Sequence, residues 1–243
     1  EEVMRAYRDI TTSAPRELTV FMVVLHAPPA PFVPPEAVGA KLVAFAVCYT
    51  GAWEELDRVV SPIRAIGGPA FDLLHEQPYV ELQSMLDGSE PKGQNYYWKA
   101  EYTTDLPDEV FAVWRESFEV CPMSAAQLLI AHVGGALNDR PADDGVVDRN
   151  VRYIIGAAGA WSPDEHEAHG DEYRSWVRDT WAQYRPFGTG VSYVNFHNED
   201  DGADRTAAAY GSNLERLEQV KAAYDPTNIF HRARNITPAL APR

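Results

Sequence analysis

The sequence is poor in the features that mark several protein classes. It has two cysteines, Cys48 and Cys121, in 243 residues, too few for a disulfide framework. No apolar run reaches the ~18 residues that span a bilayer, and no secretory signal pattern opens the chain. Acidic residues outnumber basic ones, 36 to 21, which argues against nucleic-acid backbones and anionic membranes as partners. We therefore expect neither of those partners, and we expect a cytoplasmic location.

Several catalytic motifs are missing as well. The chain has no Gly-x-Ser-x-Gly elbow, no P-loop and no Cys-x-x-Cys pair. His166 and His169 are three residues apart, whereas the zincin motif needs a spacing of four, so a solvated helix face explains them better. Asn235-Ile236-Thr237 is a formal glycosylation sequon, which we interpret as chance. The sequence therefore predicts no metal site and gives no motif support for a hydrolase.

The order of predicted elements indicates an α+β fold. Apolar and aromatic stretches predict strands at 18–26, 41–49, 94–102, 127–133 and 150–157. Helical patterns lie at 1–12, after Gly51, after Pro107 and after Ser162, where Ser162 and Glu165 form a capping box. The regular alternation of a doubly wound sheet is absent. We therefore predict an antiparallel sheet with helices packed on one face, whose other face needs a covering partner.

The last fifty residues carry the most informative pattern. An aromatic strand is predicted at Ser192–Phe196, and its alternation would place Tyr193 and Asn195 on one face. An acidic loop is expected at 198–204. Ser212 and Glu215 predict a capping-box helix start, and Asp225-Pro226 predicts the helix end.

This stretch resembles the C-terminal segment of the berberine bridge enzyme family, flavin-linked oxidases of the vanillyl-alcohol-oxidase fold group. The ordered matches are Tyr193-x-Asn195-Phe196, Tyr210-Gly211-x-Asn213, Arg216-Leu217, Lys221, Tyr224-Asp225-Pro226-x-Asn228-x-Phe230 and Asn235-Ile236-x-Pro238. Weaker similarities cover nearly the whole chain, among them Cys48-Tyr49-x-Gly51, Tyr97-Trp98-Lys99 and His132-x-Gly134-Gly135. A capped amphipathic helix with a turn would explain the helix but not the segments on either side of it.

The resemblance implies a division of the chain and a missing part. Residues 1–190 would be the substrate-binding domain, and residues 191–243 the segment that returns to an FAD-binding half. That half is not found in this sequence, so FAD would be bound mainly by residues outside it. The chain also lacks an initiator Met and opens inside a predicted helix, so we expect it to be a piece of a longer protein, inactive on its own.

The candidate site residues follow from the resemblance and from strand faces. The resemblance implies that Tyr193 is catalytic, near the reactive edge of the flavin, and that Asn195 and Asn235 contact the cofactor. An aromatic core residue and a strand-end turn are the alternatives for Tyr193 and Asn195. Tyr97 and Lys99 share a strand face, where the lysine could lower a neighbouring phenol pKa.

Tyr97 and Lys99 are therefore candidate substrate-binding residues, with a solvated sheet face as the alternative. Gln127 and His132 flank an apolar strand and complete the substrate-binding candidates, although a structural role explains His132 better. The predicted function is the substrate-binding half of an FAD-dependent oxidoreductase, which oxidises a hydroxyl- or amine-bearing small molecule by hydride transfer to a flavin that oxygen reoxidises. The alternative is a small-molecule binding module that works alone without redox activity.

Overall fold

The computed structural model describes residues 1–141, 144–145, 148–232 and 234–240. Within these residues the chain forms one antiparallel five-stranded sheet in the order β2-β1-β4-β5-β3. Its strands are β1 (Leu18–His26), β2 (Lys41–Tyr49), β3 (Asn95–Thr103), β4 (Ala125–His132) and β5 (Tyr153–Trp161). The five strands expected before residue 190 are thus confirmed, with small shifts at their ends.

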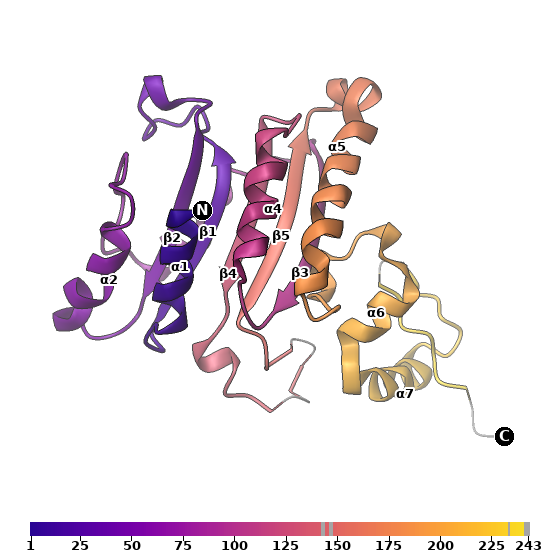
Figure 1. Cartoon of the computed structure of the whole chain (residues 1–243). Coiled ribbons are helices and arrows are strands. Elements are labelled where there is room, and N and C mark those ends of the chain that lie inside the picture. The colour runs from indigo at the N-terminus through magenta and orange to yellow at the C-terminus, as the bar shows by residue number, and fades with distance from the viewer. Residues whose placement is uncertain (142–143, 146–147, 233, 241–243) are drawn as a thin grey trace.

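Three helices cover one face of this sheet (Figure 1). They are α1 (Glu2–Thr12), α4 (Asp108–Glu119) and α5 (Pro163–Tyr184). The predicted capping box opens α5: Ser162 Oγ accepts the Glu165 N–H at 3.3 Å, and the Glu165 carboxylate accepts the Ser162 N–H at 2.9 Å. The α+β class, with helices packed on one face, is confirmed.

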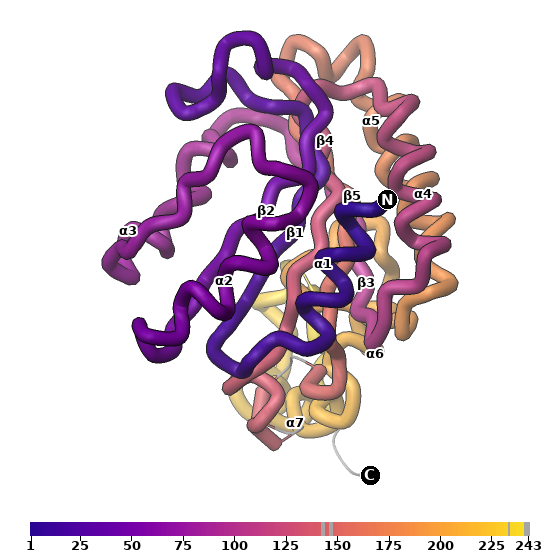
Figure 2. Tube along the Cα trace, turned by 60° about the vertical axis from the view of Figure 1, so that its left-hand side comes forward, coloured from indigo at the N-terminus to yellow at the C-terminus, as the bar shows by residue number. Residues whose placement is uncertain are grey.

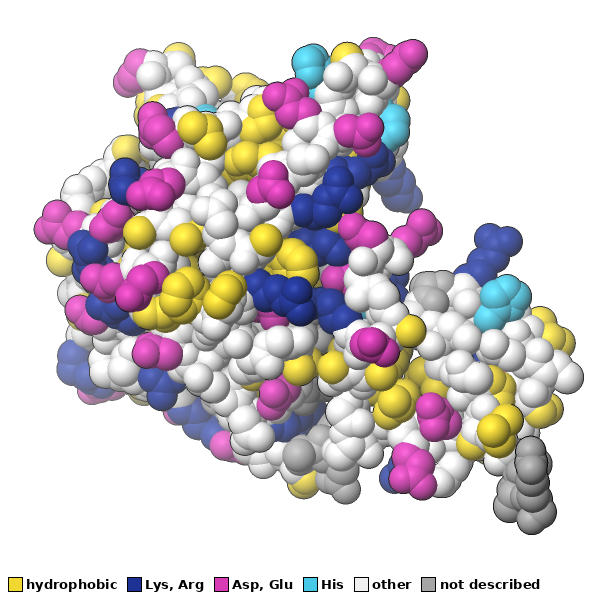
Figure 3. Space-filling view, turned by 45° about the vertical axis from the view of Figure 1, so that its right-hand side comes forward, with side chains coloured by type: hydrophobic (Ala, Val, Ile, Leu, Met, Phe, Trp, Pro, Cys, Tyr) yellow, Lys and Arg dark blue, Asp and Glu magenta, His cyan; other side chains and the backbone are white. Residues whose placement is uncertain are grey.

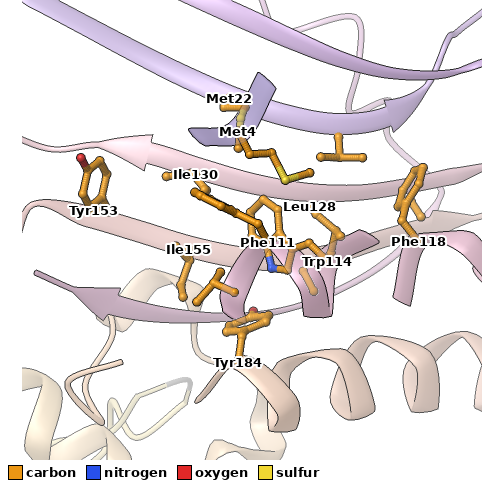
Figure 4. Close-up of a cluster of buried hydrophobic side chains, with 14 of the residues drawn as sticks. Met4, Met22, Phe111, Trp114, Phe118, Leu128, Ile130, Tyr153, Ile155 and Tyr184 are labelled. Carbon is orange, nitrogen blue, oxygen red and sulfur yellow. The ribbon is translucent and has the colours of Figure 1, made fainter. Parts of the chain in front are cut away.

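The core lies between the sheet and these helices (Figure 4). Trp114, Phe111 and Leu128 are fully buried there. Along β5, burial alternates at every residue from Tyr153 to Trp161, as expected for a strand with one covered and one uncovered face. The helix side of the sheet is therefore an ordinary packed core.

The other side, which we call the open face, is largely apolar and partly exposed. Residues paired directly across antiparallel strands share a face, so the register assigns it. Its half-exposed members are Thr19, Val23, Leu25, Leu42, Ala44, Ala46, Cys48, Tyr96, Trp98, Gln127, Leu129, Ile154, Gly156, Ala158 and Ala160. Phe21, in the same set, is 36% exposed. A face this apolar needs a cover, as the sequence predicts.

The long connection from β2 to β3 contains two short helices. α2 (Leu56–Arg64) packs beside α1, and its Val59 and Ile63 join the core. The following segment, with α3 (Tyr79–Ser84), lies on the side of the sheet away from α4 and α5 (Figure 2). Single 3₁₀ turns complete the description: Pro35–Ala37, Trp53–Glu55, Gly135–Leu137, Arg185–Phe187, Val194–Phe196, Glu199–Asp201 and Gly211–Asn213.

Three predictions for the C-terminal segment are wrong in detail. Ser192–Phe196 is not a strand, because the chain follows the β3 edge only as far as Val191 and then turns into the Val194–Phe196 3₁₀ turn. The first helix, α6 (Gly202–Tyr210), begins inside the expected acidic loop.

Ser212 caps nothing, because Gly211 at φ +51° separates α6 from α7 (Leu214–Tyr224), which starts without a side-chain cap. A capping box exists at Asn198 and Asp201 instead. The proposed boundary at residue 190 stays a prediction, and a few residues of the 191–243 unit lie outside the described ranges.

Candidate functional site

The C-terminal segment is anchored to the sheet at the end of β3. The Tyr102 N–H donates to Val191 O at 2.8 Å, and the Thr189 N–H donates to Tyr102 O at 2.8 Å. Beyond this point Ser192 and His197 are both buried and hydrogen-bonded to each other at 2.9 Å. Burial lowers the pKa of His197, so the pair is a neutral anchor at pH 7. The short turn between these residues carries two of the predicted site residues.

Tyr193 and Asn195 are brought together on this turn. Asn195 Nδ2 donates to Tyr193 Oη at 2.8 Å, and the Tyr193 ring meets Phe196 edge to face with centroids 5.7 Å apart. Because the phenol oxygen accepts this bond, its own O–H remains available as a donor. Asn195 is exposed, so its amide oxygen can accept a bond from a bound molecule.

The Tyr193 turn borders the open face. Tyr102 lies on that face at the end of β3, opposite Ile154. Burial raises the pKa of Tyr102, and the nearby Asp148 carboxylate and Tyr193 phenol add to the rise. Tyr193 therefore lies where a molecule resting on the open face could reach it.

Tyr97 and Lys99 lie elsewhere, which corrects their expected position. They pair with Gly159 and Ala157 on the helix side of the sheet, not on the open face. Both are buried. Lys99 Nζ lies 2.7 Å from Asp200 Oδ1, and Tyr97 Oη donates to Asp200 Oδ2 at 2.5 Å. Burial and this acceptor raise the pKa of Tyr97, so the lowered phenol pKa expected beside Lys99 is not found at Tyr97.

Lys99 and Asp200 belong to a larger charge cluster, only partly buried, that the sequence did not reveal. We define the charge cluster as Lys99, Glu101, Asp200, Asp201 and Arg205. Arg205 lies 2.6 Å from Glu101 Oε1 and 3.0 Å from Asp201 Oδ1, and Lys99 lies 3.1 Å from Asp201. Partial burial raises the pKa of Asp200, but hydrogen bonds from Lys99 and Tyr97 outweigh it and leave the pKa lowered.

The charge cluster joins α6 to β3 beneath α5. Figure 3 shows basic and acidic side chains gathered where the body of the molecule meets the C-terminal segment. The Trp181 indole donates to Glu101 Oε1 at 3.0 Å and carries Arg205 and Arg185 over its ring, 5.1 and 4.9 Å from the centroid. The cluster therefore sets the position of the segment that carries Tyr193.

Gln127 and His132 fall on opposite faces of β4. Gln127 pairs with Ala158 on the open face and is half-exposed. His132 pairs with Tyr153 on the helix side, and within the described residues its buried Nδ1 atom has no hydrogen-bond partner. Of the four predicted substrate-binding residues, Gln127 alone lies on the open face.

Asn235 has the features expected of a residue that contacts a further group. Its Oδ1 atom is buried and, within the described ranges, unpartnered. An unpaired buried amide oxygen is costly. Asn235 and the exposed oxygen of Asn195 are two amide acceptors that suit the polar edge of an isoalloxazine ring. The exposed amide of Asn195 thus has the chemistry that part of a flavin site needs.

In the described part of the chain, no group of three or more His, Cys, Asp or Glu side chains could hold a metal ion. No described helix is both long and apolar enough to cross a membrane. The open face with the Tyr193 turn therefore remains the candidate site.

Known proteins resemble this chain in sequence. Residues 192–237 match the family described as "Berberine and berberine like". An FAD-linked oxidoreductase of Dictyostelium discoideum is 26% identical over 193 residues, which cover 78% of this chain and 41% of that protein. An uncharacterised FAD-linked oxidoreductase of Bacillus subtilis is 26% identical over 200 residues, covering 79% of this chain and 43% of that protein.

A solved structure extends the match to the fold. Berberine bridge enzyme from Eschscholzia californica superposes with a TM-score of 0.79 at 16% identity, covering 99% of this chain and 53% of that one. The chain thus has the berberine bridge enzyme-like fold and C-terminal segment, and it is homologous to FAD-linked oxidoreductases. The predicted resemblance is confirmed. The chain spans about two-fifths of the length of the curated relatives it matches.

Proposed function

We propose that this chain is the substrate-binding half of an FAD-dependent oxidoreductase that oxidises a hydroxyl- or amine-bearing small molecule. The observation that carries the proposal is the apolar open face bordered by the hydrogen-bonded pair Tyr193 and Asn195. A partly exposed apolar sheet face of this size is typical of a surface that another domain covers. In the proposal an FAD-binding half of the same protein is that cover, and the substrate lies between the two.

The exposed surface of the C-terminal segment supports such a partner. Tyr224, Ile229 and Phe230 are 87, 70 and 80% exposed, and Val220 is also exposed. Apolar side chains grouped in this way are typical of a surface that another domain covers. The unpaired oxygen of Asn235 lies in the same segment.

The chemistry of the site is assigned to residues of this chain. When bound, FAD would supply the hydride acceptor, and oxygen would reoxidise it. Tyr193 holds or receives the proton of the substrate hydroxyl or amine. Asn195 fixes the phenol through its 2.8 Å bond. The apolar side chains of the open face exclude water, and Gln127 offers an amide there to orient a polar substrate group.

The test is Tyr193→Phe in the complete protein, measured as the rate of flavin reduction by substrate without oxygen. Loss of a group that takes part in proton transfer slows such a step about 10²–10⁴-fold. Tyr173→Phe is the matched control, because it removes one hydroxyl from α5 on the helix side, where it bonds Glu165 at 3.4 Å. An unchanged rate in Tyr193→Phe would remove Tyr193 from the mechanism.

A second experiment separates the proposal from the stand-alone binding module. The isolated chain and the complete protein are titrated with the same substrate. The proposal predicts that binding needs the complete protein, because the open face is only one wall of the site. Equal affinity for the isolated chain would favour the module.

A further inference from the structure

A pocket lies at one end of the sheet. It has a volume of about 340 Å³, within the usual range of small-molecule sites. We call it the arginine pocket. It is formed where the end of α1, the start of β1, the end of β4 and the start of β5 meet. Its lining residues include Thr11, Thr12, Arg16, His132, Gly134, Gly135, Asn138, Arg149, Asn150 and Arg152.

The charge of the arginine pocket is opposite to that of the chain. The described residues that line it include three arginines, Arg16, Arg149 and Arg152, and no aspartate or glutamate. The whole chain has 36 acidic and 21 basic residues, so its composition does not explain such a lining. Arg16 does have a carboxylate partner, Asp139, but Asp139 is not part of the lining.

Two buried nitrogen atoms of the lining are left without acceptors. Arg149 donates through Nη1 to Leu137 O at 3.2 Å, which holds its guanidinium in place. Its Nε atom is buried and, in the described part of the chain, unpartnered, as is Nδ1 of His132. Burial and the charge of Arg152 lower the pKa of His132, so the positive charge at pH 7 comes from the arginines. Leaving such buried polar atoms unpaired is costly.

The backbone at the end of β4 is shaped to form one wall. Gly135 has φ +59°, and a Cβ there would come within 2.9 Å of the Arg16 carbonyl oxygen. Glycine is thus required for two reasons: the positive φ angle, and the close approach of the Arg16 carbonyl oxygen just before β1. The wall that brings His132 and Arg16 to one pocket depends on this residue.

We propose that the arginine pocket binds a small anion that carries a phosphate or carboxylate group. Guanidinium groups match both anions with paired hydrogen bonds, and threonine hydroxyls and the Asn138 amide can complete the set. The anion would connect α1, β1, β4 and β5 at one end of the sheet. The proposal rests on the lining of this pocket and does not depend on the oxidoreductase assignment.

The experiment measures binding of inorganic phosphate to the whole 243-residue chain by calorimetry, with chloride at matched ionic strength as the reference. Phosphate is expected to bind saturably at one site and to raise the melting temperature more than chloride does. Arg16→Gln should weaken binding at least about tenfold, since one charge-assisted contact is lost. Arg149→Gln should weaken phosphate binding in the same way. Arg16→Gln disturbs folding less, because Arg16 is half-exposed. Arg58→Gln is the control of equal charge change, on the exposed surface of α2.

The outcomes decide the proposal and the source of the anion. A phosphomonoester such as glycerol 3-phosphate that binds more tightly than phosphate would identify a phosphorylated metabolite, and malonate binding best would identify a dicarboxylate. Phosphate that behaves like chloride would overturn the proposal. So would an Arg58→Gln variant that loses as much affinity as Arg16→Gln, because binding would then reflect overall charge.

Discussion

Replacing Arg205 with Gln tests whether the charge cluster holds the C-terminal segment in place. Arg205 neutralises Glu101 at 2.6 Å and Asp201 at 3.0 Å, and Glu101 is 0% exposed. Removing one partner of a buried ion pair costs about 3–5 kcal/mol, because a charge is left unpaired. In the variant, Asp201 still forms an ion pair with Lys99 at 3.1 Å, and Glu101 still accepts the hydrogen bond of the Trp181 indole. We therefore expect a loss of stability at the lower end of this range, about 3 kcal/mol. Since small domains have only about 5–15 kcal/mol of stability, the variant should still fold.

The assay is urea unfolding at several pH values. Burial raises the pKa of Glu101 above its usual value, while Arg205 lowers it, so loss of Arg205 raises it further. A carboxyl group whose pKa is raised in the folded state stabilises the fold fully at pH values below its unfolded-state pKa of 4.5. That stabilisation is lost as the pH rises through the folded-state pKa. The cost of Arg205→Gln should therefore shrink from pH 8 toward pH 5.

Two controls accompany this prediction. Glu101→Gln added to Arg205→Gln should recover much of the lost stability, because the orphaned charge is removed. Arg58→Gln, which breaks an exposed pair with Glu55, should cost less than about 1 kcal/mol. A cost below about 1 kcal/mol for Arg205→Gln, with no dependence on pH and no recovery, would refute the reasoning.

Two further predictions concern stability. Gly135→Ala should destabilise the chain by about 1–3 kcal/mol through backbone strain and the close approach to Arg16 O. Gly39→Ala, at φ +81° in open space, should cost less in the same urea unfolding experiment. Equal costs for the two variants would contradict the role of the close approach. Trp114 is 0% exposed, so Trp114→Ala should lower the free energy of unfolding by about 3–5 kcal/mol, measured as a lower melting temperature. A loss of stability under about 1 kcal/mol would mean that the core shown in Figure 4 is not continuous.

The strands were predictable because each is a compact apolar or aromatic stretch, and the capping box at Ser162 marked the start of α5 correctly. The role of β3 was not predictable in the same way. Tyr97 and Lys99 share a strand face, which suggested contact with substrate, whereas Lys99 and Glu101 in fact pair with charged side chains. Their partners Asp200, Asp201 and Arg205 lie about a hundred residues further along the chain, and no local pattern relates the two segments.

The C-terminal segment shows a second limit. Ser192–Phe196 alternates as a strand does, but a strand also needs a neighbour, and the β3 edge is followed only to Val191. Ser212 and Glu215 have capping-box spacing, yet the left-handed Gly211 had already ended one helix and set where the next begins. The resemblance found Tyr193 and Asn195 because an ordered set of residues carries more information than any one periodicity.

The most direct test of the central claim is the visible absorption spectrum of the complete protein, recorded without oxygen before and after addition of a panel of hydroxyl- and amine-bearing compounds. We expect a yellow protein whose flavin absorption is lost with at least one compound and returns when oxygen is admitted. We also expect the Tyr193→Phe variant to keep its yellow colour and to lose its flavin absorption more slowly. A colourless complete protein would contradict this expectation. So would an isolated chain that binds these compounds as tightly as the complete protein does.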